Sequence, residues 1–289
     1  MDNEMRKHDV SKYGLDLILP LSLILLAELL IFQGKMEAAM MVHAATLMLL
    51  ILSSIYIENR IYPVLMLLPL FRLLNIAMPV FFHAAIYFYP MAYAPMFGPI
   101  YFLLKEGMLS RSEAGMTMKG LWFYLPLAMA VGFALGWGEH MVLRSGMLIP
   151  DSSIKSIIIL SLTMILFVGV VEEFVFRSAL QTVMEARLGS MLGLLVTSII
   201  FGLMHSGYHL PQEILYVSFA GLVFGLLFRM TKSLPVISLA HGFTNVSLFL
   251  IAPAYSEVLI YLIGITGLMF LLTASLYKRM PRKPEPREN

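Results

Sequence analysis

A small set of acid–base side chains lies within the most apolar half of this sequence. It falls into three short patterns, EEFVFR at 172–177, FGLMH at 201–205 and HGFTN at 241–245. An ionisable group inside a membrane is costly to keep there, so each one is a candidate functional residue. A carboxylate beside an imidazole can activate a water molecule, and paired hydrogen-bond donors can stabilise an oxyanion. Together the patterns favour a hydrolytic reaction.

The first and third patterns each place two polar side chains on one face of a helix. Glu173 and Arg177 are four residues apart, a spacing that allows an intrahelical ion pair. Glu172 is rotated by about 100° from Glu173, so the two carboxylates cannot share Arg177 equally. His241 and Asn245 are also four residues apart, which lets them offer two hydrogen-bond donors to one point.

The chain between the patterns allows them to meet. The polar stretch QTVMEARLGS at 181–190 predicts a hairpin that turns near Gly189. Glu173 and His205 are equally far from that glycine, so they should face each other across an antiparallel helix pair. At about 1.5 Å per residue, His241 reaches a similar depth. The helix ending at His205 is short and is followed by SGYHLP, which predicts a break and a wet cavity within the membrane.

These positions predict that Glu172 and His205 activate a water molecule, and that His241 and Asn245 stabilise the oxyanion. The expected reaction is attack of that water on a peptide carbonyl. Serine-type and cysteine-type catalysis lack support, because the chain has no cysteine and no G-x-S-x-G motif. The absence of cysteine also excludes disulfides and thiolate metal sites.

The composition indicates a membrane protein. Of 289 residues, 59% are hydrophobic and 13% are charged, against about 25% charged in a typical soluble domain. The mean hydropathy is +0.83. The formal net charge of +2 is too small to indicate a nucleic-acid partner.

The expected fold is therefore all-α, a polytopic integral membrane helical bundle of about ten transmembrane helices. The apolar segments are 13–32, 37–57, 61–82, 84–104, 121–138, 157–180, 192–205, 214–228, 234–251 and 258–277. Lys and Arg concentrate in alternate loops, which predicts a multi-pass protein of the cell membrane with both termini in the cytoplasm. The N-terminus is too polar for a cleavable signal peptide, so the first apolar run should remain as a helix.

A polar loop at 105–119 divides the chain. Residues 1–120 are expected to form an accessory transmembrane bundle, and residues 121–277 the working domain. The charged, proline-containing tail at 278–289 should be disordered and cytoplasmic.

Other polar residues are assigned to structure. Arg72 and Asn75 are expected to make a helix–helix contact or to face a cavity. His140 and His209 are assigned to loops, with no role.

The three patterns, in this order on successive apolar helices, resemble the EExxxR, FxxxH and HxxxN motifs of the CPBP family. This family contains the type II CAAX prenyl proteases and the bacteriocin-processing (Abi) intramembrane proteases. The resemblance covers roughly residues 155–255 and implies a glutamate-type protease core within 121–277. Ser178 is a mild departure, since glycine often follows the motif's arginine.

The resemblance also implies roles for individual residues. The implied catalytic residues are Glu172, Glu173, His205, His241 and Asn245, and the implied supporting residues are Arg177 and Phe201. The implied partners are membrane lipid and a membrane-associated or lipidated peptide, with prenylated CAAX-type C-termini as one substrate class. No cofactor is needed for this mechanism.

Two other classes remain open. In a zinc-dependent membrane hydrolase, Glu172, His205 and His241 would be metal ligands, with water in the fourth position. In a transporter, a non-catalytic scaffold or a bacteriocin-immunity protein, the same residues would relay protons, bind an ion or hold helices together.

Overall fold

The computed structural model describes residues 14–279 except positions 83, 150 and 152. Within that part of the chain every regular element is a helix and no strand occurs, which confirms the all-α prediction. Of the tail predicted to be disordered, residues 280–289 lie outside the described residues. Lys278 and Arg279 still belong to the last helix.

In chain order the helices are α2 (Leu15–Phe32), α3 (Met36–Tyr56), α4 (Ile61–Phe81), α5 (Ala85–Tyr93), η1 (Ala94–Met96), α6 (Phe97–Lys105), α7 (Leu121–Leu143), α8 (Ile154–Leu162), η2 (Thr163–Gly169), α9 (Val170–Glu173), η3 (Phe174–Gln181), α10 (Thr182–Leu188), α11 (Ser190–Leu203), η4 (Ser206–Tyr208), α12 (Pro211–Thr231), α13 (Leu234–Val246), η5 (Ser247–Ile251) and α14 (Ala252–Arg279). The elements η1 and η4 are 3-10 helices, and η2, η3 and η5 are π-helices.

Seven segments of the described chain are long and apolar enough to cross a membrane. They are Met36–Tyr56, Ile61–Phe81, Leu121–Leu143, Ile154–Leu188, Ser190–Tyr208, Pro211–Thr231 and Leu234–Lys278. The polytopic membrane bundle is thus confirmed, but the count of ten helices is not. The run predicted at 84–104 is broken into α5, η1 and α6, with Pro95 in the break. The runs predicted at 234–251 and 258–277 are joined without a loop, through η5 and the start of α14, where the chain kinks at the non-helical Tyr255.

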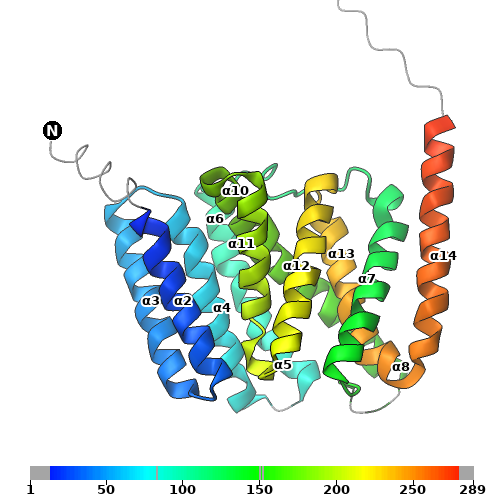
Figure 1. Ribbon diagram of the computed structural model, residues 1–289, viewed down its shortest axis with the longest axis horizontal. Coiled ribbons are helices and arrows are strands. Elements are labelled where there is room, and N and C mark those ends of the chain that lie inside the picture. The colour runs from blue at the N-terminus through cyan, green and yellow to red at the C-terminus, as the bar shows by residue number, and fades with distance from the viewer. Residues whose placement is uncertain (1–13, 83, 150, 152, 280–289) are drawn as a thin grey trace, which may run out of the picture.

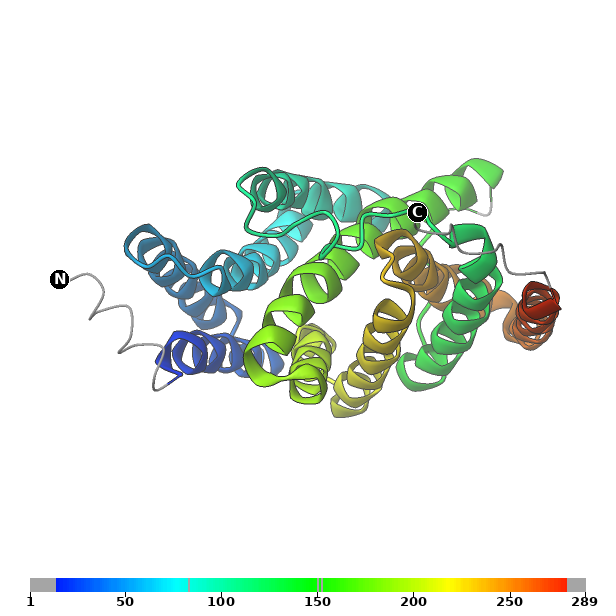
Figure 2. The same cartoon turned by 90° about the horizontal axis from the view of Figure 1, so that it is seen from above.

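The helices stand side by side in an elongated bundle, with α2 and α3 at one end and α14 at the other (Figure 1). Seen from above, the run from α8 to α10 crosses the bundle obliquely (Figure 2). On one flank it contacts α4 and α5, and on the other it contacts α11, α12 and α13. Helices from both halves of the sequence therefore meet at the segment that carries the EEFVFR pattern.

Glu172 and Glu173 lie in α9, a single α-helical turn between the π-helices η2 and η3. Wide turns of this kind are rare and occur frequently at functional sites. A rotation of about 100° between neighbouring residues, as predicted from the sequence, holds for an uninterrupted α-helix. The π-helical turns on either side change the direction in which the two carboxylates point.

Glycines on α7 and η2 let α13 pack very closely. A Cβ atom on Gly132 would lie 2.5 Å from the carbonyl oxygen of Ala240, and one on Gly169 would lie 2.5 Å from that of Ser238. Gly136, one turn along α7, meets the carbonyl oxygen of Thr244 in the same way. Small residues permit such close approach of membrane helices. The helix that carries the HGFTN pattern is thereby fixed on two sides.

Candidate active site

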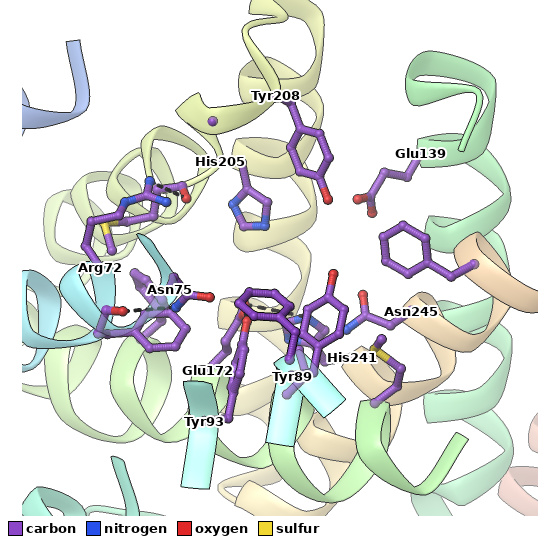
Figure 3. Close-up of a pocket in the computed structure, with 18 residues that line it drawn as sticks. Arg72, Asn75, Tyr89, Tyr93, Glu139, Glu172, His205, Tyr208, His241 and Asn245 are labelled. Atoms are coloured by element: carbon purple, nitrogen blue, oxygen red, sulfur yellow. Dashed lines mark hydrogen bonds and ion pairs between the residues drawn. The ribbon is translucent and has the colours of Figure 1, made fainter. Parts of the chain in front are cut away.

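The three patterns converge on one cavity of about 270 Å³, which is lined by α4, α5, α7, the run from η2 to η3, the two residues after α11, η4, α13 and η5. Its polar lining residues are Arg72, Asn75, Tyr89, Tyr93, Glu139, Glu172, His205, Tyr208, His241 and Asn245. Arg72 and Asn75 lie on one side, Glu139 lies on the other, and Glu172, His205, His241 and Asn245 lie between them (Figure 3). Phenylalanine, methionine and valine side chains complete the wall.

Glu172 is held by a hydrogen bond at one oxygen only. The hydroxyl of Tyr93, on α5, donates a hydrogen bond to Oε1 of Glu172. Oε2 is buried and has no hydrogen-bond partner among the described residues. It lies 3.7 Å from Nε2 of His241. A carboxylate anchored in this way keeps one oxygen that accepts no hydrogen bond from the described residues, and a general base needs an oxygen that can still accept a proton.

Glu173 is fully buried and uses both oxygens. Oε1 accepts a hydrogen bond from Nδ1 of His241 at 2.7 Å, and Oε2 lies 3.2 Å from Nε of Arg177. The predicted pairing of Glu173 with Arg177 is confirmed. The prediction that Glu173 faces His205 is wrong, since both of its oxygens are engaged by other residues. The π-helical turns beside α9 explain the change of direction.

His241 lies between two carboxylates and two aromatic rings. Its Nδ1 contacts Glu173 and its Nε2 faces Glu172, so an imidazolium with hydrogen on both nitrogens matches both neighbours. Phe224 stacks on the imidazole, with ring centroids 5.1 Å apart and planes at 13°. Phe201 meets it edge-on at 5.8 Å. The ring is therefore fixed in orientation, with Nε2 available as a donor at the cavity.

His205 lies two residues beyond the end of α11 and is oriented by the last turn of that helix. Its Nδ1 lies 3.0 Å from the carbonyl oxygen of Phe201. A carbonyl oxygen only accepts, so Nδ1 carries the hydrogen and Nε2 of the neutral ring is an acceptor. His205 lines the cavity, as Glu172 does. Tyr208 stacks over the imidazole at 6.4 Å and 13°.

Phe201 connects the elements of the site. Besides meeting His241, its ring meets His205 edge-on at 5.2 Å and lies 4.7 Å below the guanidinium carbon of Arg177. A buried cation over an aromatic face is stabilised by the ring quadrupole. Asn245, one turn beyond His241 on α13, lies beside that histidine at the cavity wall (Figure 3).

Several residues of the cavity carry little signal in the sequence. Tyr89, Tyr93 and Tyr208 lie in aromatic-rich segments that look like ordinary membrane packing, and Glu139 looks like an isolated charge. The only signal for Glu139 was its type, a carboxylate within an apolar run. The prediction that Arg72 and Asn75 make a helix contact or face a cavity is confirmed, since both line it.

Two histidines differ in their placement. His140 was assigned to a loop, which is wrong: it lies in the last turn of α7, where its Nδ1 lies 3.1 Å from the hydroxyl of Ser145. His209 lies between η4 and α12, as predicted.

The fit of a metal ion can be judged from the arrangement of ligands. Within residues 14–279, apart from the three positions left out, no three His, Cys, Asp or Glu side chains are grouped closely enough to hold one ion. Glu172, His205 and His241 thus line a common cavity without forming a ligand cluster.

A comparison with protein families gave a match. Residues 154–247 match the family model described as type II CAAX prenyl endopeptidase Rce1-like. The matched segment contains all three sequence patterns and excludes α2 to α7. The comparisons with curated proteins and with solved structures gave no match.

Proposed function

We propose that this membrane protein is a glutamate-type intramembrane endopeptidase, and the match of residues 154–247 to the Rce1-like type II CAAX prenyl endopeptidases supports this proposal. The observation that carries the proposal is the shared cavity. It brings together a carboxylate oxygen with free lone pairs, on Glu172, and a ring nitrogen that accepts, on His205. The same wall holds His241 and Asn245, which serve as the oxyanion donors in this proposal.

In the first step, a water molecule lies between Oε2 of Glu172 and Nε2 of His205. Glu172 takes one proton from the water, and the water oxygen forms a bond to the carbonyl carbon of the substrate. The electron pair of the carbonyl double bond moves to its oxygen. Nε2–H of His241 and the side-chain amide of Asn245 stabilise the resulting oxyanion.

In the second step, the carbon–nitrogen bond breaks and the carbonyl re-forms. The proton held by Glu172 passes to the leaving nitrogen, which departs as an amine and restores the carboxylate. Glu173 and Arg177 do not touch the substrate in this scheme. Glu173 keeps hydrogen on Nδ1 of His241, and Arg177 compensates the charge of Glu173.

The substrate class follows from the family and the setting. We propose a membrane-associated or lipidated peptide, with prenylated CAAX-type C-termini as the first candidates, that enters from lipid or from the cytoplasmic side. The phenylalanine and methionine side chains of the cavity wall suit an apolar substrate. Cytoplasmic placement of both termini, proposed from the Lys and Arg distribution, would put the loop at 105–119 on the same side as the substrate.

The test is cleavage of fluorogenic peptides, with and without a prenylated cysteine, by the purified protein. Glu172→Gln and His205→Ala should lower kcat by about 10²- to 10⁴-fold, the range of general acid–base catalysis. Asn245→Ala should lower it by about 10²-fold, as for one oxyanion donor. Glu106→Gln, an exposed carboxylate in the loop after α6, is the control.

A chelator arm separates the proposal from its zinc-dependent alternative. Activity that survives the chelator supports the metal-free mechanism. Activity that is lost with the chelator and restored by Zn²⁺ would replace it with a metallohydrolase. Cleavage that persists at the wild-type rate in Glu172→Gln would refute the role of Glu172.

A further inference from the structure

The short loop that follows α11 carries His205, and it is attached to helices outside the segment that matches the family. Nη2 of Arg72, on α4, donates to the carbonyl oxygen of Met204 at 2.6 Å. The hydroxyl of Ser206 donates to Glu28, on α2, at 2.6 Å. Nδ1 of His209 lies 3.0 Å from the carbonyl oxygen at the end of α2. The loop is thus bound at three points within six residues.

Arg72 is itself held in place. Its Nε donates to Oε1 of Glu28 at 2.8 Å, and its Nη2 contacts Oε2 of the same carboxylate. Glu28 is almost fully buried and also lies 3.3 Å from Nε2 of the fully buried His43, on α3. A two-point arginine–carboxylate contact fixes the plane of the guanidinium as well as its position. α2, α3 and α4 therefore present one rigid donor to the loop.

The group that receives this donor would otherwise lack a partner. Met204 is the C-cap residue of α11. The last carbonyl oxygens of a helix accept no hydrogen bond from within the helix, because no further turn follows to donate one. The carbonyl of Met204 shares its planar peptide unit with the nitrogen of His205. Holding that oxygen therefore fixes the peptide plane from which His205 projects.

We infer that Arg72, braced by Glu28, is a positioning residue that holds His205 at the angle needed for water activation, so that the N-terminal helices complete the site. This inference rests on the proposed function for its catalytic consequence. The attachment of the loop to Arg72 can be measured without catalysis, by amide hydrogen exchange.

Arg72→Lys is the decisive variant. Lysine keeps a positive charge beside Glu28, but it lacks the planar fork that reaches Glu28 and the carbonyl of Met204 together. We expect kcat to fall by about 10- to 100-fold, the effect of misplacing a catalytic group by about 1 Å, with KM changed less than about threefold. Amide hydrogen exchange in the segment 203–209 should be faster, while the unfolding temperature stays near that of the wild type.

The matched control is Arg60→Lys. Arg60 also pairs with a glutamate, Glu113, at 2.8 Å, but this pair lies at the exposed loops away from the cavity. It should leave kcat and exchange at 203–209 unchanged. If Arg72→Lys folds poorly, the double variant Glu28→Gln with Arg72→Met removes both charges and is measured in the same way.

The outcomes distinguish failure of the attachment by Arg72 from failure of the proposed function. Wild-type kcat and wild-type exchange in Arg72→Lys would overturn the inference, and equal loss in Arg60→Lys would do the same. If the wild type cleaves no peptide, the proposed function fails, and exchange at 203–209 decides the attachment by itself. Faster exchange then supports the role of Arg72, and unchanged exchange refutes it.

Discussion

Tyr93, on α5, donates a hydrogen bond to Glu172, the candidate general base. The variant Tyr93→Phe removes that hydrogen bond alone. The change removes one hydroxyl from a buried ring and leaves the packing against Phe71, at 5.0 Å between ring centroids, intact. It also leaves Oε1 of Glu172 without its donor, because no other described group donates to that oxygen. The carboxylate is then free to rotate, and Oε2 loses its fixed place at the cavity.

The magnitude follows from the charge of the acceptor. A hydrogen bond to an ionised group is worth about 1.5–3 kcal/mol. If the transition state loses that amount, kcat falls by about 10- to 150-fold, since about 1.4 kcal/mol corresponds to a factor of ten. KM should stay within about twofold, because Tyr93 does not contact the scissile bond in the proposed mechanism.

Tyr89→Phe is the matched control for this prediction. Tyr89 lies one turn earlier on α5 and lines the same cavity, but its hydroxyl makes no hydrogen bond to the described residues. The assay is steady-state cleavage of the best fluorogenic peptide by the wild type and both variants. A Tyr93→Phe enzyme with wild-type kcat would refute the reasoning, and equal losses in both variants would show that the hydroxyl of Tyr93 has no special part.

Three further predictions concern the support of the site. Glu173→Gln should lower the free energy of unfolding by about 3–5 kcal/mol in denaturant titration, because it leaves Arg177 buried and unpaired; adding Arg177→Met should recover stability without recovering activity. Gly136→Val should lower the unfolding temperature and abolish cleavage, because a side chain there collides with the backbone of α13, whereas Gly264→Val meets open space and should change neither. The pKa of Glu113 is lowered to about 2 by the backbone amide of Ser110, by Arg60 and by the hydroxyl of Ser110, with burial opposing them. Its folded pKa is below its ordinary value of 4.5, so its contribution to stability is complete above that pH and is lost as the pH falls toward 2. Amide exchange of residues 108–116 should therefore become faster, after correction for the intrinsic rate, between pH 5 and pH 3, and Glu113→Gln should remove this dependence.

The sequence by itself determined the features that depend on composition and on local spacing. Its low charge and long apolar runs required a helical membrane bundle, because backbone groups in lipid must be satisfied within each segment. The four-residue spacing of Glu173 and Arg177 was enough to predict their ion pair, since both residues lie on one helix and no other element is involved. The order of the three patterns indicated the family that the match to residues 154–247 supports.

The tertiary structure alone decided which residues meet across helices. Counting from a turn placed Glu173 opposite His205, but the π-helical turns around α9 and the close packing of α13 on α7 and η2 bring His241 to it instead. Tyr93 reaches the site from a helix whose sequence carries no signal of it, and the sequence marked Arg72 as a buried charge without indicating that it contacts the loop of His205. Such contacts depend on the rotation and separation of whole helices, which many weak packing interactions set together. No local spacing encodes these packing interactions, so only the folded chain reveals that α4 and α5 complete the cavity and that α2 holds Arg72 in place.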